Sequence, residues 1–365
     1  MGSKRELPPL LVRADASAES GTGHVMRCLA LAQAWSERGG KAVFLSRCDS
    51  PALRDRVQAA GAHIIPIALD LSPEADLQAT MASLPLRCAP MVVLDGYHFD
   101  VDYQRALRAR GYRLMVIDDS VRLPFYDADI LLNQNLDAAR LDYHCACDTA
   151  LFLGPTYALL RREFRSWHRH PHNAPEMARN ILVTLGGSDP GNATLKVIRA
   201  LRQLGGERMR VRIVAGPANP HVDELRDAAR AFPGELELLT AASGMAALMS
   251  WADLAVSAAG STCWELACVG LPAVLLVIAE NQRANANELA AAGFAVNLGW
   301  HCDVSVERLA SEVDGLINCR SRRARMSRRG KTLVDGYGAD RVAVALIKLA
   351  TTLRTPLSSG DYSGL

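Results

Sequence analysis

The stretch LLVRADASAESGTGHVMRCLALAQAWSERGG, residues 10–40, decides the fold of this chain. It opens with an apolar run and continues through a turn that contains Gly21 and Gly23. The apolar residues that follow recur at helical spacing from Val25 to Trp35, and a glycine pair ends the helix. A strand, a glycine-rich turn and a helix in this order form the start of a β-α-β unit, which predicts a parallel sheet covered by helices.

Short β-rich runs alternate with helical patterns along the rest of the chain and fall into two series. The first series is LLVRAD at Leu10, AVFL at Ala42, HIIPI at His63, MVVLD at Met91, RLMVID at Arg113, ILLN at Ile130 and LFLG at Leu151. The second is NILVTLGG at Asn180, RVRIVAG at Arg210, LELL at Leu236, DLAVSAAG at Asp253, PAVLLVIAE at Pro272 and AVNLG at Ala295. Near-continuous apolar runs are typical of strands buried on both faces. We therefore predict an α/β fold with two Rossmann-like domains.

The domain boundaries follow from a change in pattern between the two series. Residues 161–179 are polar, contain proline and lack a helical or strand period, so we predict an interdomain linker there. Three alternating histidines in it are interpreted as part of an exposed hinge rather than as a metal site. The predicted domains are residues 1–160 and 180–338, with a last helix at about 339–354 that packs back on the first domain.

Composition narrows the class of protein. The 365 residues are 49% hydrophobic and 22% charged, with a net charge of +2, which predicts a globular chain without a nucleic-acid footprint. Nine cysteines without a regular framework favour a reducing compartment, and no apolar window is long enough to span a bilayer. We expect a cytoplasmic monomer without membrane insertion. The basic stretch 320–330 is predicted to be a solvated helix, with contact to an anionic membrane surface or an acidic partner as the alternative.

His24 stands where the first glycine-rich turn becomes a helix. In doubly wound sheets, ligands bind at the carboxyl ends of the strands, which is where this turn lies. The glycines Gly21 and Gly23 permit close approaches of a ligand to the backbone. Because a helix N-terminus disfavours positive charge, we expect the His24 ring to be neutral and able to accept a proton. A histidine that merely caps the turn is the alternative.

The second series carries turns suited to anions. The run SAAGSTCWEL passes from a strand through Gly260, Ser261 and Thr262 into a helix, whose free N–H groups predict a phosphate site without a metal. Gly186, Gly187 and Ser188 form a second such turn, and two turns imply a diphosphate. Glu265, one helical turn further, could accept hydrogen bonds from ribose hydroxyls or could only complement the helix dipole. Glu280, Asn281 and Gln282 suit sugar hydroxyls or acetamido groups, although such side chains also cap helices.

Three acidic stretches have open roles. Asp100 and Asp102 resemble a metal motif of sugar transferases, but Asp100 is better interpreted as a helix N-cap. Asp95 with Tyr97, and Asp118 with Asp119, follow strands of the first series. Each pair could take part in the site or could only anchor its loop.

These stretches together resemble a known family. RADASAESGTGHVMRCLALA, LDGYHFD, VIDD, LLNQN, GPTYALLRREF, TLGGSDPGNAT, SAAGSTCWEL, LPAVLLVIAENQ and DGYGADRV are similar to the UDP-2,4-diacetamido-2,4,6-trideoxy-β-L-altropyranose hydrolases of pseudaminic acid biosynthesis. The second half also resembles the peptidoglycan N-acetylglucosaminyltransferase. Both families share the glycosyltransferase B (GT-B) architecture. The chain departs from the hydrolase pattern at Gly96, where a histidine is expected, with His98 two places on.

The resemblance implies a role for each matching residue. His24 would be the catalytic base, with Asp15 and Tyr97 as further catalytic candidates. The substrate would be a UDP-sugar attacked by water with inversion, and no cofactor or metal is expected. The residues implied in substrate binding are Arg13, Gly21, Gly23, Gly187 and Ser188, with Met245 near uracil, Gly260, Ser261, Thr262, Glu265, Asn281 and Gln282. A glycosyltransferase that uses a UDP-sugar donor, and a non-catalytic UDP-sugar-binding protein, are the alternatives.

Overall fold

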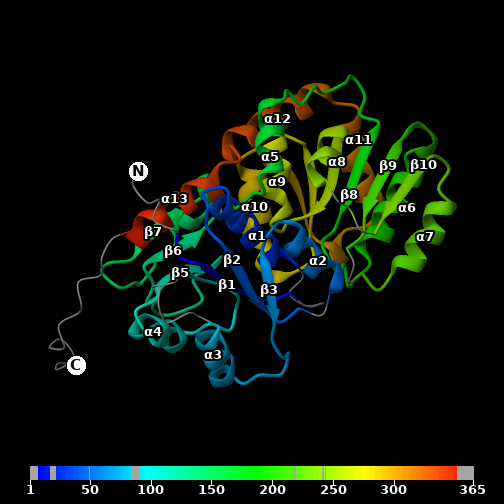
Figure 1. Ribbon diagram of the computed structural model, residues 1–365. Coiled ribbons are helices and arrows are strands. Elements are labelled where there is room, and N and C mark those ends of the chain that lie inside the picture. The colour runs from blue at the N-terminus through cyan, green and yellow to red at the C-terminus, as the bar shows by residue number, and fades with distance from the viewer. Residues whose placement is uncertain are drawn as a thin grey trace.

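The computed structural model describes residues 7–16, 22–48, 50–83, 91–216, 219–240, 242 and 244–351. These residues form two lobes, each built on one parallel sheet (Figure 1). We call the residues around the seven-stranded sheet the first lobe and those around the six-stranded sheet the second lobe. Every run that the sequence predicts as a strand forms one, and the predicted α/β class is confirmed.

The first sheet has the strand order β3-β2-β1-β4-β5-β6-β7. Its strands are β1 (Leu10–Ala14), β2 (Ala42–Ser46), β3 (His63–Pro66), β4 (Met91–Asp95), β5 (Arg113–Ile117), β6 (Ile130–Asn133) and β7 (Ala150–Leu153). The helices of this lobe are α1 (Gly23–Ser36), α2 (Pro51–Ala59), α3 (Pro73–Ala82) and α4 (Val101–Ala109), with short 3-10 turns η1 (Ala138–Arg140) and η2 (Pro155–Tyr157). The strand order reverses direction between β1 and β4, so a crevice opens at their carboxyl ends, where α1 begins.

The second sheet repeats this plan with the order β10-β9-β8-β11-β12-β13. Its strands are β8 (Asn180–Thr184), β9 (Arg210–Val214), β10 (Glu235–Leu239), β11 (Leu254–Ala258), β12 (Ala273–Val277) and β13 (Ala295–Trp300). Its helices and turns are α6 (Ala193–Gln203), η3 (Gly206–Arg208), α7 (Val222–Arg230), α8 (Met245–Trp251), α9 (Thr262–Val269), η4 (Glu280–Gln282), α10 (Arg283–Ala291), η5 (His301–Asp303), α11 (Val306–Ile317) and α12 (Arg320–Leu333). The reversal falls between β8 and β11, which are followed by the two predicted anion turns.

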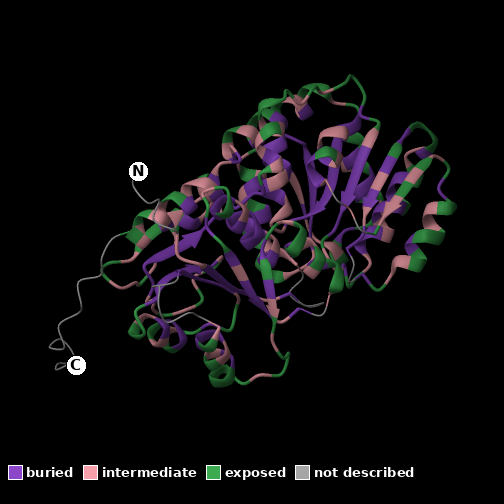
Figure 2. Ribbon diagram, in the orientation of Figure 1, coloured by how far each residue is buried: buried purple, intermediate pink, exposed green. Residues whose placement is uncertain are grey.

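Both sheets are buried between helices, as Figure 2 shows by the purple strands. In the first lobe, Trp35 of α1 is fully buried in a core with β1 and β4. The final helix α13 (Gly338–Thr351) returns to this lobe and packs against α1, with Val342 and Leu346 in the same core (Figure 1). The chain therefore crosses between the lobes twice.

The segment 161–179 contains a helix that is packed against the second lobe. This helix, α5 (Glu163–Arg169), contacts α9, and its Phe164 is fully buried. Part of the predicted linker is therefore packed against the second lobe.

The basic stretch forms α12, and Arg323 is its one buried arginine. Arg323 is fully buried and donates to the carbonyl oxygens of Leu316 and Ile317 at 2.5 and 2.6 Å. It therefore satisfies the last carbonyls of α11, which have no partner within their own helix. Arg325, Arg328 and Arg329 of the same helix are exposed.

Candidate active site

A cleft with a volume of about 290 Å³ lies between the two lobes. Residues from the carboxyl ends of both sheets line it, which is where a doubly wound sheet binds ligands. Ten of the residues predicted from the sequence line this one cleft: Gly23, His24, Tyr97, Gly187, Ser188, Gly260, Ser261, Thr262, Asn281 and Gln282. The histidine and the anion turns, which are more than 150 positions apart in the sequence, thus face the same space.

Glycines let the two lobes approach each other at this cleft. A Cβ atom added to Gly23 would stand 3.3 Å from Oγ of Ser261, across the cleft. A Cβ atom added to Gly187 would stand 3.7 Å from the backbone nitrogen of Thr22. The turn that carries His24 therefore packs directly beside both anion turns of the second lobe.

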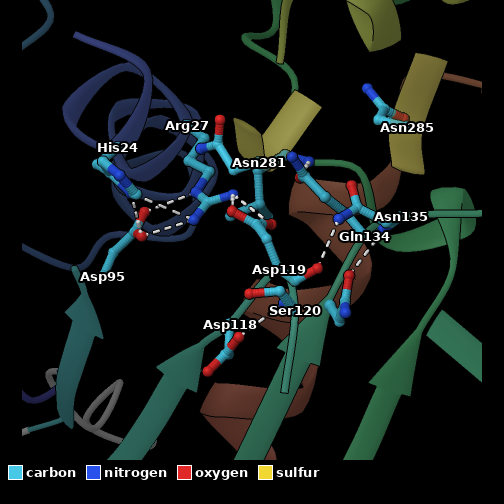
Figure 3. Close-up of polar contacts among 12 residues, drawn as sticks. His24, Arg27, Asp95, Asp118, Asp119, Ser120, Gln134, Asn135, Asn281 and Asn285 are labelled. Atoms are coloured by element: carbon cyan, nitrogen blue, oxygen red, sulfur yellow. Dashed lines mark hydrogen bonds and ion pairs between the residues drawn. The ribbon is translucent and has the colours of Figure 1, made fainter. Parts of the chain in front are cut away.

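His24 is held by a buried carboxylate. Its Nδ1 lies 2.6 Å from Oδ1 of Asp95, which ends β4 and is fully buried (Figure 3). An ionised carboxylate can only accept, so the hydrogen of a neutral ring lies on Nδ1 and the lone pair lies on Nε2. His24 is 9% exposed and lines the cleft. The arrangement offers the cleft one oriented proton acceptor, as a histidine–aspartate pair does in acid–base catalysis.

Arg27, one turn after His24 on α1, compensates the charge of Asp95. Its Nε and Nη2 donate to the two carboxylate oxygens at 2.7 and 2.6 Å. Its Nη1 also donates to both oxygens of Asp119 at 2.8 and 2.9 Å. Burial alone would raise the pKa of Asp95, but the charge of Arg27 and the hydrogen bonds from Arg27 and His24 hold this pKa well below its usual range. Asp95 therefore stays ionised and keeps the ring of His24 in place.

Tyr97 joins the two lobes beside His24. Its ring stands edge-on to the His24 ring, with 5.1 Å between centroids, and the Arg122 guanidinium covers its other side at 4.4 Å. Nδ2 of Asn281 donates to the Tyr97 hydroxyl at 2.7 Å. This contact between two predicted site residues bridges the first lobe to the second beside His24.

The second lobe presents unpaired backbone donors to the cleft. Within the described part of the chain, the N–H groups of Gly187, Ser188, Ser261 and Thr262 have no hydrogen-bond acceptor. Those of Ser261 and Thr262 stand at the positive end of α9. Asn285 on α10 fixes this turn, because its Nδ2 donates to the carbonyl of Ala259 at 2.8 Å. Backbone donors placed in this way are suited to binding an anion.

Four predicted residues are described but do not line the cleft. Arg13 is fully buried, donates to Asp76 of α3 through Nε at 3.1 Å and pairs with Asp15. Asp15 also accepts from the backbone N–H of Arg47 at 2.8 Å. These contacts join β1 to α3 and to the residue that follows β2. A fifth predicted residue, Gly21, lies outside the described residues.

The residues predicted at ribose and uracil lie beside α9. Glu265 pairs with Arg161 at 2.9 Å. Burial raises the pKa of Glu265, and Arg161 works against that rise. Met245 begins α8 and is buried in the core that contains Trp264. Glu265 lies in α9 and Met245 packs in the same core, but neither residue lines the cleft. Their predicted contacts with a nucleotide therefore stay predictions.

The structure also bears on the open acidic stretches. Asp100 caps α4 by accepting from the N–H of Tyr103 at 2.8 Å, which confirms the cap. Asp118 is buried, accepts from the hydroxyl of Tyr126 at 2.6 Å and anchors its loop, whereas Asp119 lines the cleft. The ring of His98 packs on Phe99 with 4.0 Å between centroids, away from the cleft lining.

Arg27, Gln134, Asn135 and Asn285 line the cleft and were missed as site residues. Arg27 could have been predicted from the sequence, because it stands one helical turn after His24 on the same face of the helix. Gln134 and Asn135 follow β6 directly, at the same edge of the sheet as the other site residues.

In the described part of the chain, no three His, Cys, Asp or Glu side chains are placed to hold a metal ion. None of the described helices is both long and apolar enough to cross a membrane.

The Gly187 turn depends on a second glycine behind it. A Cβ atom added to Gly216 would overlap the carbonyl group and Cα of Gly187. Because backbone cannot rotate away as a side chain can, Gly216→Ala should displace the turn and weaken UDP binding by about 10-fold, measured by calorimetric titration. Gly315→Ala in α11, where the added Cβ meets nothing closer than 3.9 Å, is the control. An unchanged UDP affinity in Gly216→Ala would show that this turn does not contribute to nucleotide binding.

The chain matches known proteins over both lobes. A family model described as the glycosyltransferase family 28 C-terminal domain matches residues 180–337. The chain is 31% identical to the UDP-N-acetylglucosamine–N-acetylmuramyl-(pentapeptide) pyrophosphoryl-undecaprenol N-acetylglucosamine transferase of Halorhodospira halophila, with 93% of this chain and 99% of that protein covered. It is 23% identical to the UDP-2,4-diacetamido-2,4,6-trideoxy-β-L-altropyranose hydrolase of Campylobacter jejuni, with 79% of this chain and 98% of the hydrolase covered.

Other relatives are matched over a shorter part. The spore coat polysaccharide biosynthesis protein SpsG of Bacillus subtilis is 31% identical over 60% of this chain. The chain spans between 51% and 64% of the length of this protein and of two further curated relatives. Among solved structures, Acinetobacter baumannii MurG is similar with a TM-score of 0.64 at 18% identity, with 94% of this chain and 99% of MurG covered.

This chain belongs to the glycosyltransferase family 28 proteins. Its architecture is the GT-B fold, as the two parallel sheets and the similarity to MurG show. The resemblance seen in the sequence motifs is confirmed, since both the diacetamido-sugar hydrolase and the peptidoglycan transferase are relatives.

Proposed function

We propose that this protein is a hydrolase that releases UDP from a UDP-diacetamido-trideoxy-hexose, UDP-2,4-diacetamido-2,4,6-trideoxy-β-L-altropyranose, in pseudaminic acid biosynthesis. The observation that carries the proposal is the His24–Asp95 pair: among the described residues Nε2 of His24 has no hydrogen-bond partner, and His24 lines a cleft that the anion turns also line. The name of the Campylobacter relative, which the chain matches over 98% of its length, supports the choice of substrate.

In the proposed reaction, Nε2 of His24 accepts a proton from a water molecule as that water attacks the anomeric carbon. The bond between this carbon and the diphosphate oxygen breaks, and UDP leaves on the opposite face with inversion at C1. Asp95 stabilises the imidazolium that forms and prevents the ring from turning. Help from a general base of this kind typically contributes about 10²- to 10⁴-fold to the rate.

The second lobe acts on the leaving group. The donors of Gly187, Ser188, Ser261 and Thr262 would hold the charge that develops on the diphosphate. A nucleoside diphosphate whose charge is held leaves readily, so neither a general acid nor a metal is needed in this proposal. Gln282 and Asn281 would contact the sugar or the phosphate, Glu265 the ribose and Met245 the uracil.

The bridge from Tyr97 to Asn281 favours water over a larger nucleophile. It crosses between the lobes next to His24, and we infer that it hinders an acceptor alcohol from reaching the ring. Transfer of the sugar to an acceptor is the second candidate, favoured by the match over 99% of the Halorhodospira transferase. In that reaction His24 would take its proton from the acceptor hydroxyl instead of from water.

Incubation with the UDP-sugar alone separates the two candidates. We expect stoichiometric UDP and free diacetamido sugar, followed by proton NMR, at a rate that is unchanged when chelator is added. Release of UDP only after addition of a carbohydrate acceptor would assign transferase activity. Binding of the UDP-sugar without turnover under either condition would assign a binding protein.

A further inference from the structure

We propose that Gln134, Asn135 and Asp119 form a subsite in the first lobe that recognises an acetamido group of the sugar. This inference rests on the proposed function for the nucleotide half of the ligand and adds the residues that select the sugar. All three side chains line the cleft and follow β5 or β6, which are neighbouring strands of the sheet. They therefore form one wall beside Asp95 and His24 (Figure 3).

Gln134 supplies a hydrogen-bond donor from a residue that is almost completely buried. Its side chain is only 2% exposed, and its Oε1 accepts from the backbone N–H of Leu159 at 3.1 Å. Because a backbone N–H can only donate, this contact fixes which end of the amide is oxygen. The opposite end, Nε2, has no acceptor within the described part of the chain. Because Gln134 lines the cleft, this unpartnered donor on a nearly buried residue is available to an acceptor atom of a ligand.

Asn135 and Asp119 supply acceptors next to it. Nδ2 of Asn135 donates to the backbone carbonyl of Asp119 at 3.0 Å, which fixes this amide as well and leaves its Oδ1 without a donor among the described residues. The Asp119 carboxylate is held by two hydrogen bonds from Arg27 and is 18% exposed. Each of its oxygens can still accept from a ligand.

A donor beside fixed acceptors matches an acetamido group. That group presents a carbonyl oxygen and an N–H on separate atoms, so it can pair with Gln134 and with Asn135 or Asp119 together. A sugar hydroxyl can also donate and accept, but it presents both functions at one oxygen, whereas an acetamido group presents them on two atoms. We expect separate donors and acceptors to favour the acetamido group, because an analogue that lacks one of the two functions leaves a polar group of the site unpaired.

The variant Gln134→Glu removes the donor and keeps the acceptor. A glutamate oxygen can still accept from Leu159, so the loop stays anchored, while an oxygen replaces Nε2. Gln104→Glu is the matched control: Gln104 is fully buried in the same lobe, accepts from the backbone N–H of Asp127 at 2.9 Å and lies away from the cleft. Gln134→Met, which has no charge, checks that any effect is not electrostatic repulsion from Asp119.

The experiment measures the dissociation constants of UDP, UDP-glucose and the UDP-diacetamido sugar in the His24→Ala background, where we expect turnover to be slower by about 10²- to 10⁴-fold. We expect Gln134→Glu and Gln134→Met to weaken binding of the diacetamido sugar nucleotide by about 10- to 100-fold. UDP and UDP-glucose should bind within about threefold of their original affinity, and Gln104→Glu should change none of the three. Equal losses for all three ligands, or no loss for the diacetamido sugar, would overturn the subsite. Because these are binding constants, they test it even if the wild-type protein does not hydrolyse the sugar nucleotide.

Discussion

His24→Ala should lower the rate of UDP release by about 10²- to 10⁴-fold, because the variant lacks the only oriented proton acceptor that we assign to the attacking water. The affinity for UDP should stay within about threefold of wild type, because the anion turns belong to the second lobe. Steady-state kinetics with the UDP-diacetamido sugar and calorimetry with UDP measure the two quantities separately.

His63→Ala serves as the control for this variant. His63 is exposed at the start of β3, outside the cleft, so its removal should leave both quantities unchanged. If His24→Ala retains a rate within a few-fold of wild type, the histidine has no catalytic role. If it loses UDP affinity in proportion to rate, the ring acts in binding rather than in proton transfer.

Asp95→Asn should have an effect of similar size for a different reason. Each oxygen of Asp95 accepts from Arg27, and one of them also contacts His24, so an amide nitrogen at either place meets a donor. The ring of His24 then loses the group that fixes its hydrogen on Nδ1. We expect kcat to fall by about 10²- to 10⁴-fold, and the free energy of unfolding to fall by roughly 3 kcal/mol because a buried ion pair is broken.

Asp118→Asn distinguishes catalysis from stability in this experiment. Asp118 is also buried at the end of β5 and bonded to a tyrosine hydroxyl, but it lies off the cleft. The Asp118→Asn variant should be less stable than the wild type but should keep its kcat when the rate is measured well below the unfolding temperature. A purely structural Asp95 would behave in the same way as Asp118.

Much of the fold could be predicted from the sequence because buried parallel strands leave a local signal. The apolar runs at Leu10 and Met91 form β1 and β4, and the helical stripe that ends at Trp35 forms α1. Strand order leaves no such signal, since it depends on how helices pack on the sheet. The predicted hinge at residues 161–179 has a polar composition, yet Phe164 within it is buried against the second lobe and belongs to α5.

The sequence predicts those parts of the candidate site that lie at turns between a strand and a helix. The turns at Gly187 and Gly260 and the position of His24 follow from strand-to-helix junctions, and all three reach the cleft. The partner of His24 was not predictable as such, because Asp95 is 71 positions away and meets the ring only because β4 pairs with β1. Gln134 is a similar case: its free donor is defined by a contact with Leu159, which only the folded chain provides.

Arg13 and Asp15 illustrate the opposite outcome. The family resemblance implied roles at the substrate for Arg13, which lies in β1, and for Asp15, which follows it, but each is paired with an opposite charge within the first lobe. A buried arginine must be paired, and Asp76 of α3 supplies part of that pairing from 63 positions away. The sequence shows the charges without showing which of them the protein itself neutralises.

Hydrolysis in water enriched in ¹⁸O tests the central claim most directly, because it identifies the atom that the water attacks. Attack at the anomeric carbon, with the diphosphate held by the second lobe, predicts that mass spectrometry finds the ¹⁸O label in the released sugar and none in UDP. A label in the terminal phosphate of UDP would show that water attacks phosphorus, and would contradict the role that we assign to His24.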